Sequence, residues 1–207
     1  DIEADRMAGA LFDPAEVETE RTVIISEREG SENHPTFVLR EEIQSTAIKV
    51  HPYHHHTLGW KGDLRTISRD DLWGHYRRHY HPANAIAVAV GPFDPARMVD
   101  RIAARFAHVP AGEPTAPVRA LEPEQRGERR FVVRGTDSTA YVAVAFHAPA
   151  VGDADYLACQ VLTTVLGGAD GMSMSSGVLP NRSSRLYHAL VDAGLATEVS
   201  CSMPATI

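Results

Sequence analysis

The sequence has few cysteines, no excess of basic residues and no long apolar run. Its two cysteines, Cys159 and Cys201, form no CxxC pair, so disulfides are not what stabilises this chain. Acidic residues outnumber basic ones by 27 to 20, which leaves no basic footprint for nucleic acid. No apolar run approaches the roughly 20 residues that span a bilayer, and no signal-peptide pattern occurs. We therefore expect neither a nucleic-acid partner nor a membrane association.

What is present is a globular composition. The 207 residues are 43% hydrophobic, which is enough for a core in one large domain or two small ones. The chain opens at Asp1 without methionine, inside the helical pattern Ile2, Met7, Ala10 and Leu11, so we expect a fragment or a processed chain. The Ala- and Arg-rich composition, with no signal, favours a bacterial cytoplasmic protein.

Helix boundaries are well marked in several places. Asp13 and Pro14 start a helix that we expect to end near Glu29, with Gly30 as its stop. Further helices are predicted from residue 35, from Ser68 with Asp71 three residues later, and from Asp94. Glycines close two more predicted helices, over 153–168 and 181–195.

Apolar runs between these helices predict strands. Compact or alternating apolar patterns occupy 85–91, 129–135, 139–150 and 196–205. A shift to Pro, Glu and Gly over 111–126 predicts a linker, which gives domains 1–110 and 127–207. Helices alternating with strands in this way predict an α+β protein.

Three groups of residues are candidates for chemistry. Glu20 and Glu27 lie seven residues apart and share a helix face, a spacing that is common on solvated helices. His51, His54, His55 and His56 could bind Ni, Cu or Zn, although a solvated loop is the favoured interpretation, because consecutive loop histidines diverge. The Gly- and Ser-rich stretch 165–190 lacks the GxxxxGK[ST] phosphate-loop pattern.

Four longer motifs resemble the M16 metallopeptidases, the family of insulinase, pitrilysin and the mitochondrial processing peptidases. They are the glutamate helix around "ERTVIISE", "HPYxxxxxGW" from His51, "RDDLxxxYRRHYxPxNAxxxxxGxFDP" from Arg69, and "SRLYxxLVxxGLA" from Ser184. The resemblance covers nearly the whole chain. It implies mixed, mainly antiparallel sheets with helices packed on one face, residues 1–110 being the later part of one M16-like half and 127–207 the first part of the next.

The resemblance also implies a zinc site. In that family two histidines of an HxxEH motif bind zinc and its glutamate is the general base, while the second acid of an E-x6-E pair is the third ligand. By this resemblance Glu27 corresponds to the third zinc ligand, and Glu20 corresponds to an acid that orients a ligating histidine. The chain contains no HxxEH; His51-Pro-Tyr-His54-His55 has histidine in place of the base. Hence we expect Zn²⁺ in the intact parent protein, and neither bound zinc nor peptidase activity in this chain alone.

Three hypotheses follow. The first is part of a zinc metalloendopeptidase that cleaves peptides or unfolded polypeptides, working with a second M16-like domain or subunit. The second is a non-catalytic M16-like partner subunit or peptide-binding scaffold, against which the retention of Glu20 and Glu27 argues mildly. The third is an isolated metal-binding module built on residues 51–56.

Overall fold

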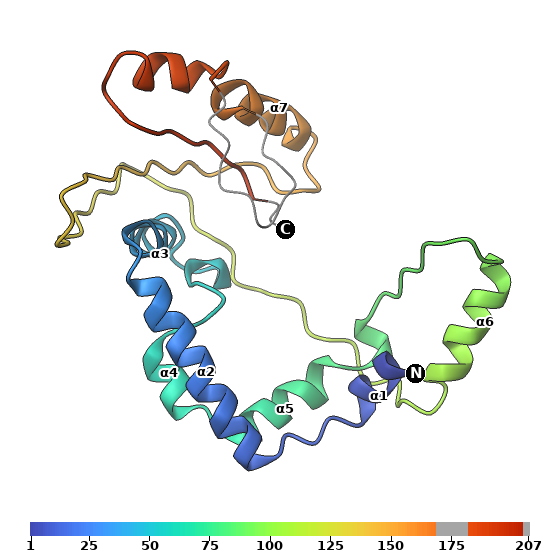
Figure 1. The fold of residues 1–207 in the computed structure, drawn as a ribbon. Helices are drawn as coiled ribbons and strands as arrows, with labels where there is room; N and C mark the ends of the chain where they lie inside the picture. Colours follow the sequence, from blue (N-terminus) through green and yellow to red (C-terminus); the bar gives the residue numbers. More distant parts are fainter. Residues whose placement is uncertain (169–181, 205–207) are drawn as a thin grey trace. The chain divides into compact units, whose positions relative to one another are not determined.

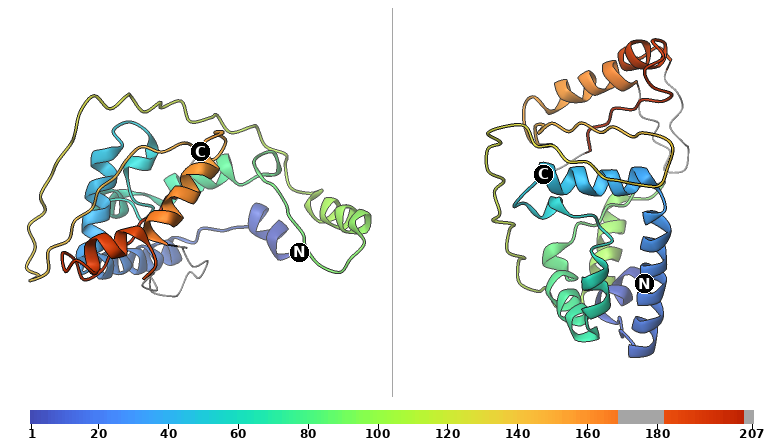
Figure 2. Two further views of the ribbon diagram at one scale, coloured as in Figure 1. Left: turned by 90° about the horizontal axis from the view of Figure 1, so that it is seen from above. Right: turned by 90° about the vertical axis from the view of Figure 1, so that its left-hand side faces the viewer.

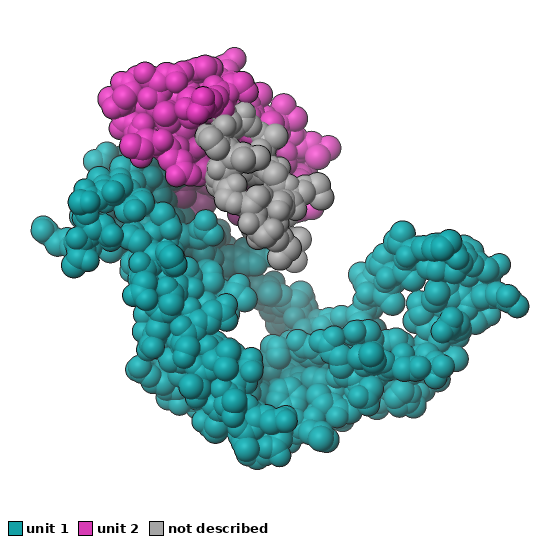
Figure 3. Space-filling model, in the orientation of Figure 1, with its two compact units in different colours: residues 1–144 teal, residues 145–207 magenta. Residues whose placement is uncertain are grey.

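The computed structural model describes residues 1–168 and 182–204, so the middle of the Gly- and Ser-rich stretch and the start of the helix expected at 181–195 lie outside it. The chain divides into two compact units, residues 1–144 and 145–207 (Figure 3). The domain limits expected from composition, 1–110 and 127–207 around a linker, remain a prediction. No helix in the described ranges is long and apolar enough to cross a membrane.

The first unit begins with three helices, α1 (Ile2–Ala8), α2 (Pro14–Glu32) and α3 (Pro35–Ala47). The predicted start of α2 is confirmed, because the Asp13 carboxylate accepts hydrogen bonds from the backbone N–H groups of Ala15 at 2.8 Å and Glu16 at 3.4 Å. Its predicted stop is wrong: Gly30 lies inside the helix, which continues to Glu32. The three added residues, 30–32, matter because the last of them, Glu32, makes ion pairs of its own.

Shorter helices follow in the same unit. They are η1 (Pro52–His54), α4 (Lys61–Thr66), α5 (Arg69–His79), η2 (Pro82–Asn84) and α6 (Pro95–Phe106). Both predicted caps are present: Ser68 and Asp71 form a reciprocal capping box at α5, and Asp94 accepts from the N–H of Arg97 at α6. Within the unit, α3 and α4 both contact α2, and Figure 2 shows α3 lying across the end of α2.

An aromatic cluster joins the start of the chain to α5. The rings of Phe12, Trp73 and Tyr76 lie with centroids 5.2–5.8 Å apart, and the buried Tyr76 donates its hydroxyl to the carbonyl of Arg6 at 2.9 Å. This cluster fixes the loop from which α2 starts.

In the second unit, α7 (Tyr156–Gly167) and the π-helical turn η3 (Tyr187–Val191) are the helical elements of the described residues. The predicted glycine closure of α7 is confirmed, with Gly168 at φ 93°. Gly167 is required there by close packing, because a Cβ atom on it would lie 2.6 Å from the Cβ of Cys201.

The predicted fold class is wrong for the residues described. Ranges 1–168 and 182–204 contain helices and turns but no strand, so the expected α+β arrangement of mixed, mainly antiparallel sheets is not formed. Figure 1 shows 85–91, 129–135 and 139–150 as plain traces rather than strand arrows. A strand exists only when a neighbour about 4.8 Å away completes its hydrogen-bond ladder. Here Ile86 and Val90 are more than 90% exposed, as single unpaired segments would be.

Candidate functional site

Helix α2 carries the two predicted site residues. Glu20 and Glu27 are both exposed, and within the described residues neither side chain takes part in a hydrogen bond or an ion pair. Seven residues make almost two helical turns, so the two carboxylates lie on one side of α2 within about 20° of each other. That side therefore presents two free carboxylates.

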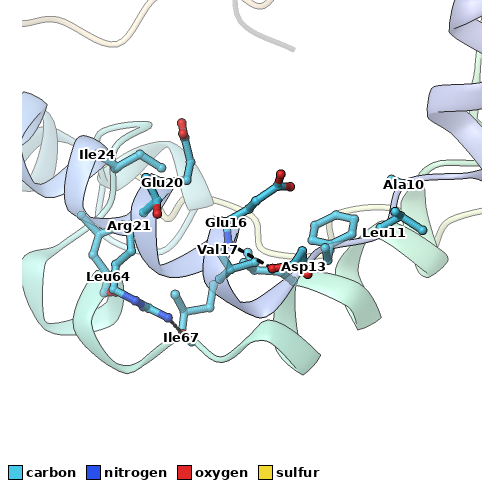
Figure 4. A pocket seen from close by; sticks show the side chains of 13 residues that line it. Ala10, Leu11, Asp13, Glu16, Val17, Glu20, Arg21, Ile24, Leu64 and Ile67 are labelled. Atoms are coloured by element: carbon cyan, nitrogen blue, oxygen red, sulfur yellow. Dashed lines mark hydrogen bonds between the residues drawn. The ribbon is translucent and has the colours of Figure 1, made fainter.

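An arginine follows each acid, and the first of them reaches away from the acids. Arg21 donates from Nη2 to the carbonyl of Ile67 at 2.6 Å and from Nη1 to the carbonyl of Leu64, both at the end of α4. It also pairs with Glu18 on its own helix at 3.0 Å. Figure 4 shows Glu20 and Arg21 leaving α2 on different sides, Arg21 toward α4.

The second arginine is the most buried charged group of the first unit. Arg28 is 3% exposed and binds both carboxylate oxygens of Glu41 on α3, at 2.9 and 2.7 Å. Its remaining N–H groups donate to Glu32 at 3.0 Å and to the carbonyl of Gly59 at 2.6 Å. The hydrogen bond with Glu41 raises the pKa of the Arg28 guanidinium above its ordinary value, although burial acts in the opposite direction.

Two rings and a lysine complete the surroundings of Arg28. Its guanidinium carbon lies 5.8 Å from the ring centroid of Phe37 and 5.3 Å from that of Trp60. Lys61 at the start of α4 pairs with Glu32, and this contact lowers the pKa of Glu32 and raises that of Lys61. Because α2 continues past Gly30, its residue Glu32 connects the C-terminal end of α2 to α4 through this ion pair.

Neither arginine was singled out from the sequence. The available signal was the repeated pair Glu-Arg, at 20–21 and again at 27–28. On a helix, each arginine points about 100° away from the acid before it. The result is two exposed acids, each beside an arginine that is partly buried at position 21 and buried at position 28.

A hollow of about 710 Å³ lies beside Glu20, between the start of α2 and the α4–α5 segment (Figure 4). Its walls are mainly apolar, with the carboxylates of Glu16 and Glu20 among the lining groups. The apolar part comprises Ala10, Leu11, Phe12, Val17, Ile24, Leu64, Ile67 and Leu72. Glu27 lies outside this hollow.

The described residues do not by themselves form a zinc site. Across 1–168 and 182–204, no three His, Cys, Asp or Glu side chains lie together as a metal would require. A catalytic zinc accepts a carboxylate oxygen but takes three protein ligands. Glu27, exposed and unpaired within these ranges, fits one of those positions and the remaining ligands are not supplied here.

The histidines of 51–56 are engaged with their own backbone. His51 Nδ1 accepts from the N–H of Tyr53 at 3.2 Å and so caps η1, and His56 Nδ1 accepts from the N–H of Leu58 at 3.3 Å. His54 Nδ1 lies 2.8 Å from the carbonyl of His51. These contacts match the solvated-loop interpretation better than a shared metal site.

Comparisons with known proteins place this helix and its surroundings in context. The model of the family described as "Peptidase M16 inactive domain" matches residues 66–206. The chain is 28% identical over 189 residues to the probable mitochondrial-processing peptidase subunit beta of Schizosaccharomyces pombe, covering 88% of this chain and 40% of that protein. It is 27% identical over 168 residues to the zinc protease PqqE of Helicobacter pylori, covering 79% and 38%.

A solved structure has the same fold. The crystal structure of a protease from Helicobacter pylori superimposes with a TM-score of 0.81 over 98% of this chain and 48% of that one, at 24% identity. This likeness supports an M16-like course of the chain, although the sheets we expected are absent from the described residues. The chain spans less than half the length of these relatives. Since the family model matches most of its residues, the chain belongs to the M16 peptidase family.

Proposed function

We propose that this chain is part of a zinc metalloendopeptidase that hydrolyses peptides or unfolded polypeptides. In this proposal Glu27 is the third zinc ligand, and Glu20 accepts a hydrogen bond from a ligating histidine and so orients its ring. The observation that carries it is the pair of exposed, unpartnered carboxylates on one side of a helix whose other sides are anchored. The relatives named as zinc protease and processing peptidase support it.

The chain's share of the chemistry is binding and orientation. Zinc, when bound, polarises a peptide carbonyl and lowers the pKa of a water molecule. Glu27 offers one oxygen ligand, and Glu20, two turns away on the same side, offers an acceptor for an imidazole N–H. The two histidines and the general base come from outside this chain. A second M16-like domain or subunit would complete the working protein.

The ligand role is tested by zinc content of the full-length parent protein. We expect Glu27→Gln to lose most of its zinc, measured by inductively coupled plasma mass spectrometry, because the neutral amide is a much poorer ligand. Glu16→Gln, an exposed acid on the same helix, is the matched control and should keep its zinc. Unchanged zinc in Glu27→Gln would remove Glu27 from the site.

One observation favours a second function. The matching family model is described as an inactive domain, and this is the description that a non-catalytic partner subunit or peptide-binding scaffold would fit. The two functions separate on the full-length sequence and its metal. An HxxEH motif with bound zinc supports the peptidase, whereas a parent protein with neither, which still binds unfolded peptide, supports the scaffold.

A further inference from the structure

We propose that Arg21 and Arg28 are positioning residues that fix the rotation of α2 about its own axis and thereby aim Glu20 and Glu27. This inference rests on the proposed function, because it assigns the arginines a role toward the zinc ligand. It is carried by the contacts of the two guanidinium groups and by their spacing from the acids.

The spacing makes the two arginines a matched pair of anchors. They lie seven residues apart, as the acids do, so both leave α2 on nearly the same side, about 10 Å apart along the axis. Each is one residue after an acid, which turns it about 100° from that acid. Holding the arginines in place therefore sets the direction of the acids without touching them.

Each arginine binds a different helix beside α2. Arg28 is held by a two-point contact with Glu41 on α3 and by the carbonyl of Gly59, while the rings of Phe37 and Trp60 cover it. The planar fork of a guanidinium fixes orientation as well as distance. A lysine could make the charge contact but not this geometry.

Arg21 anchors the other end. Its side chain is 15% exposed and donates to two carbonyls at the end of α4, Leu64 and Ile67, one of them at 2.6 Å. Carbonyls at a helix end lack donors within their own helix, so they are free to accept. Because Arg28 is bonded to Glu41 on α3 and Arg21 to the end of α4, rotation of α2 about its axis would break hydrogen bonds to both helices.

Small rotations would matter at the carboxylates. A side chain reaches about 5–6 Å from the helix axis, so a roll of about 20° displaces its tip by about 2 Å. That displacement is as long as the Zn–O bond itself, about 2.0–2.2 Å. A ligand on a helix free to roll would spend much of its time out of bonding range.

The test is zinc affinity of the folded full-length protein, measured by competition with a chelator and reported beside the thermal unfolding midpoint. We expect Arg28→Lys and Arg21→Lys each to weaken zinc binding by about tenfold or more, the range found for residues that orient metal ligands. Arg40→Lys, an exposed arginine on α3, is the matched control and should leave the affinity unchanged.

A second pair of variants distinguishes a loss of zinc binding from a loss of folding. Glu41→Gln removes the partner charge of Arg28 while keeping its shape, and we expect weaker zinc binding from it, whereas Glu42→Gln on the exposed side of α3 should have no effect. A lower unfolding midpoint with unchanged zinc affinity in Arg28→Lys, Arg21→Lys and Glu41→Gln would show that the arginines only stabilise the fold and would overturn the inference.

The inference and the proposed function fail in different ways. If Glu27→Gln loses zinc while the arginine variants keep full affinity, only the positioning role is wrong. If Glu27→Gln keeps its zinc, or if the full-length protein binds none, the ligand role is wrong and the positioning role falls with it.

Discussion

Among the residues that the structure describes, Glu122 has a strongly lowered pKa. Its carboxylate accepts hydrogen bonds from the backbone N–H groups of Lys49, Val50 and His51, at 2.8, 2.8 and 3.2 Å. Desolvation acts to raise the pKa of Glu122, but these three donors, with Arg129 nearby, lower it from 4.5 to about 2. Residues 111–126, predicted from their composition to be a linker, are therefore hydrogen-bonded through Glu122 to the backbone just after α3.

This depressed pKa gives a pH-dependent prediction. Because the pKa of Glu122 is lower in the folded chain, its stabilising contribution is complete above pH 4.5 and is lost as the pH falls toward 2. We expect the amide proton shifts of Lys49 and Val50, followed by NMR, to titrate with a midpoint near 2. Glu122→Gln should abolish that titration and Glu124→Gln should preserve it. A midpoint near 4.5 would contradict the hydrogen bonds described.

At the same scale, the sequence predicted half of the candidate site. Glu20 and Glu27 could be found because the resemblance specifies an acid pair at a fixed spacing. Arg21 and Arg28 could not, since their partners, the carbonyls near 64–67 and Glu41, are distant in sequence and no local pattern links them. A short motif shows which side chains are present, but it does not show which hydrogen-bond partners a distant segment provides for them.

At the scale of elements, most of the longer helices were predictable, whereas α4 was missed and the strands were wrong. Caps at Asp13, Ser68 and Asp94 are local chemistry, and all three were confirmed. The prediction for Gly30 was wrong because Glu32 beyond it forms ion pairs with Arg28 and Lys61, and these stabilise three more residues of helix. The apolar run 85–91 predicts a strand, which the structure does not form, because a sheet also needs a neighbouring strand that the run itself does not encode.

The capping box of α5 provides a prediction for an element. Ser68→Ala removes the hydroxyl that accepts from the N–H of Asp71 at 3.1 Å, and the loss of an N-cap of this kind costs about 1 kcal/mol. We expect the α5 amides to lose about that much protection in native-state hydrogen exchange. Ser45→Ala, whose hydroxyl bonds a carbonyl within its own helix, serves as the control. Equal protection of α5 in both variants would show that the box contributes nothing.

At the scale of the whole chain, little apolar surface is buried. Within the described residues, the buried hydrophobic residues are Ala4, Tyr76 and Val109, although a composition of 43% hydrophobic residues predicts a substantial core. Large side chains of the extended segments stay in solvent, among them Val142 and Phe146 at 88% and 86% exposure. Each Å² of apolar surface left in water lacks the stabilisation of about 25 cal/mol that burial in a core would give.

This exposure predicts how the chain behaves by itself. We expect the isolated chain to bind a hydrophobic dye such as anilinonaphthalene sulfonate strongly, because its extended segments offer unburied side chains. In hydrogen exchange, the amides of 85–91 and 139–146 should exchange at rates close to those of an unstructured peptide, while α2 is protected. Slow exchange across 85–91 would mean that these segments find partners in solution.

The one-residue offset between the acids and the arginines of α2 also separates two kinds of evolutionary constraint. Substitutions at Arg21 and Arg28 disturb the packing of α3 and α4 around the helix, whatever the protein does. Substitutions at Glu20 and Glu27 leave those contacts intact. Under the proposed zinc role, loss of the metal would therefore remove the constraint on Glu20 and Glu27, while the contacts of Arg21 and Arg28 would continue to constrain the helix.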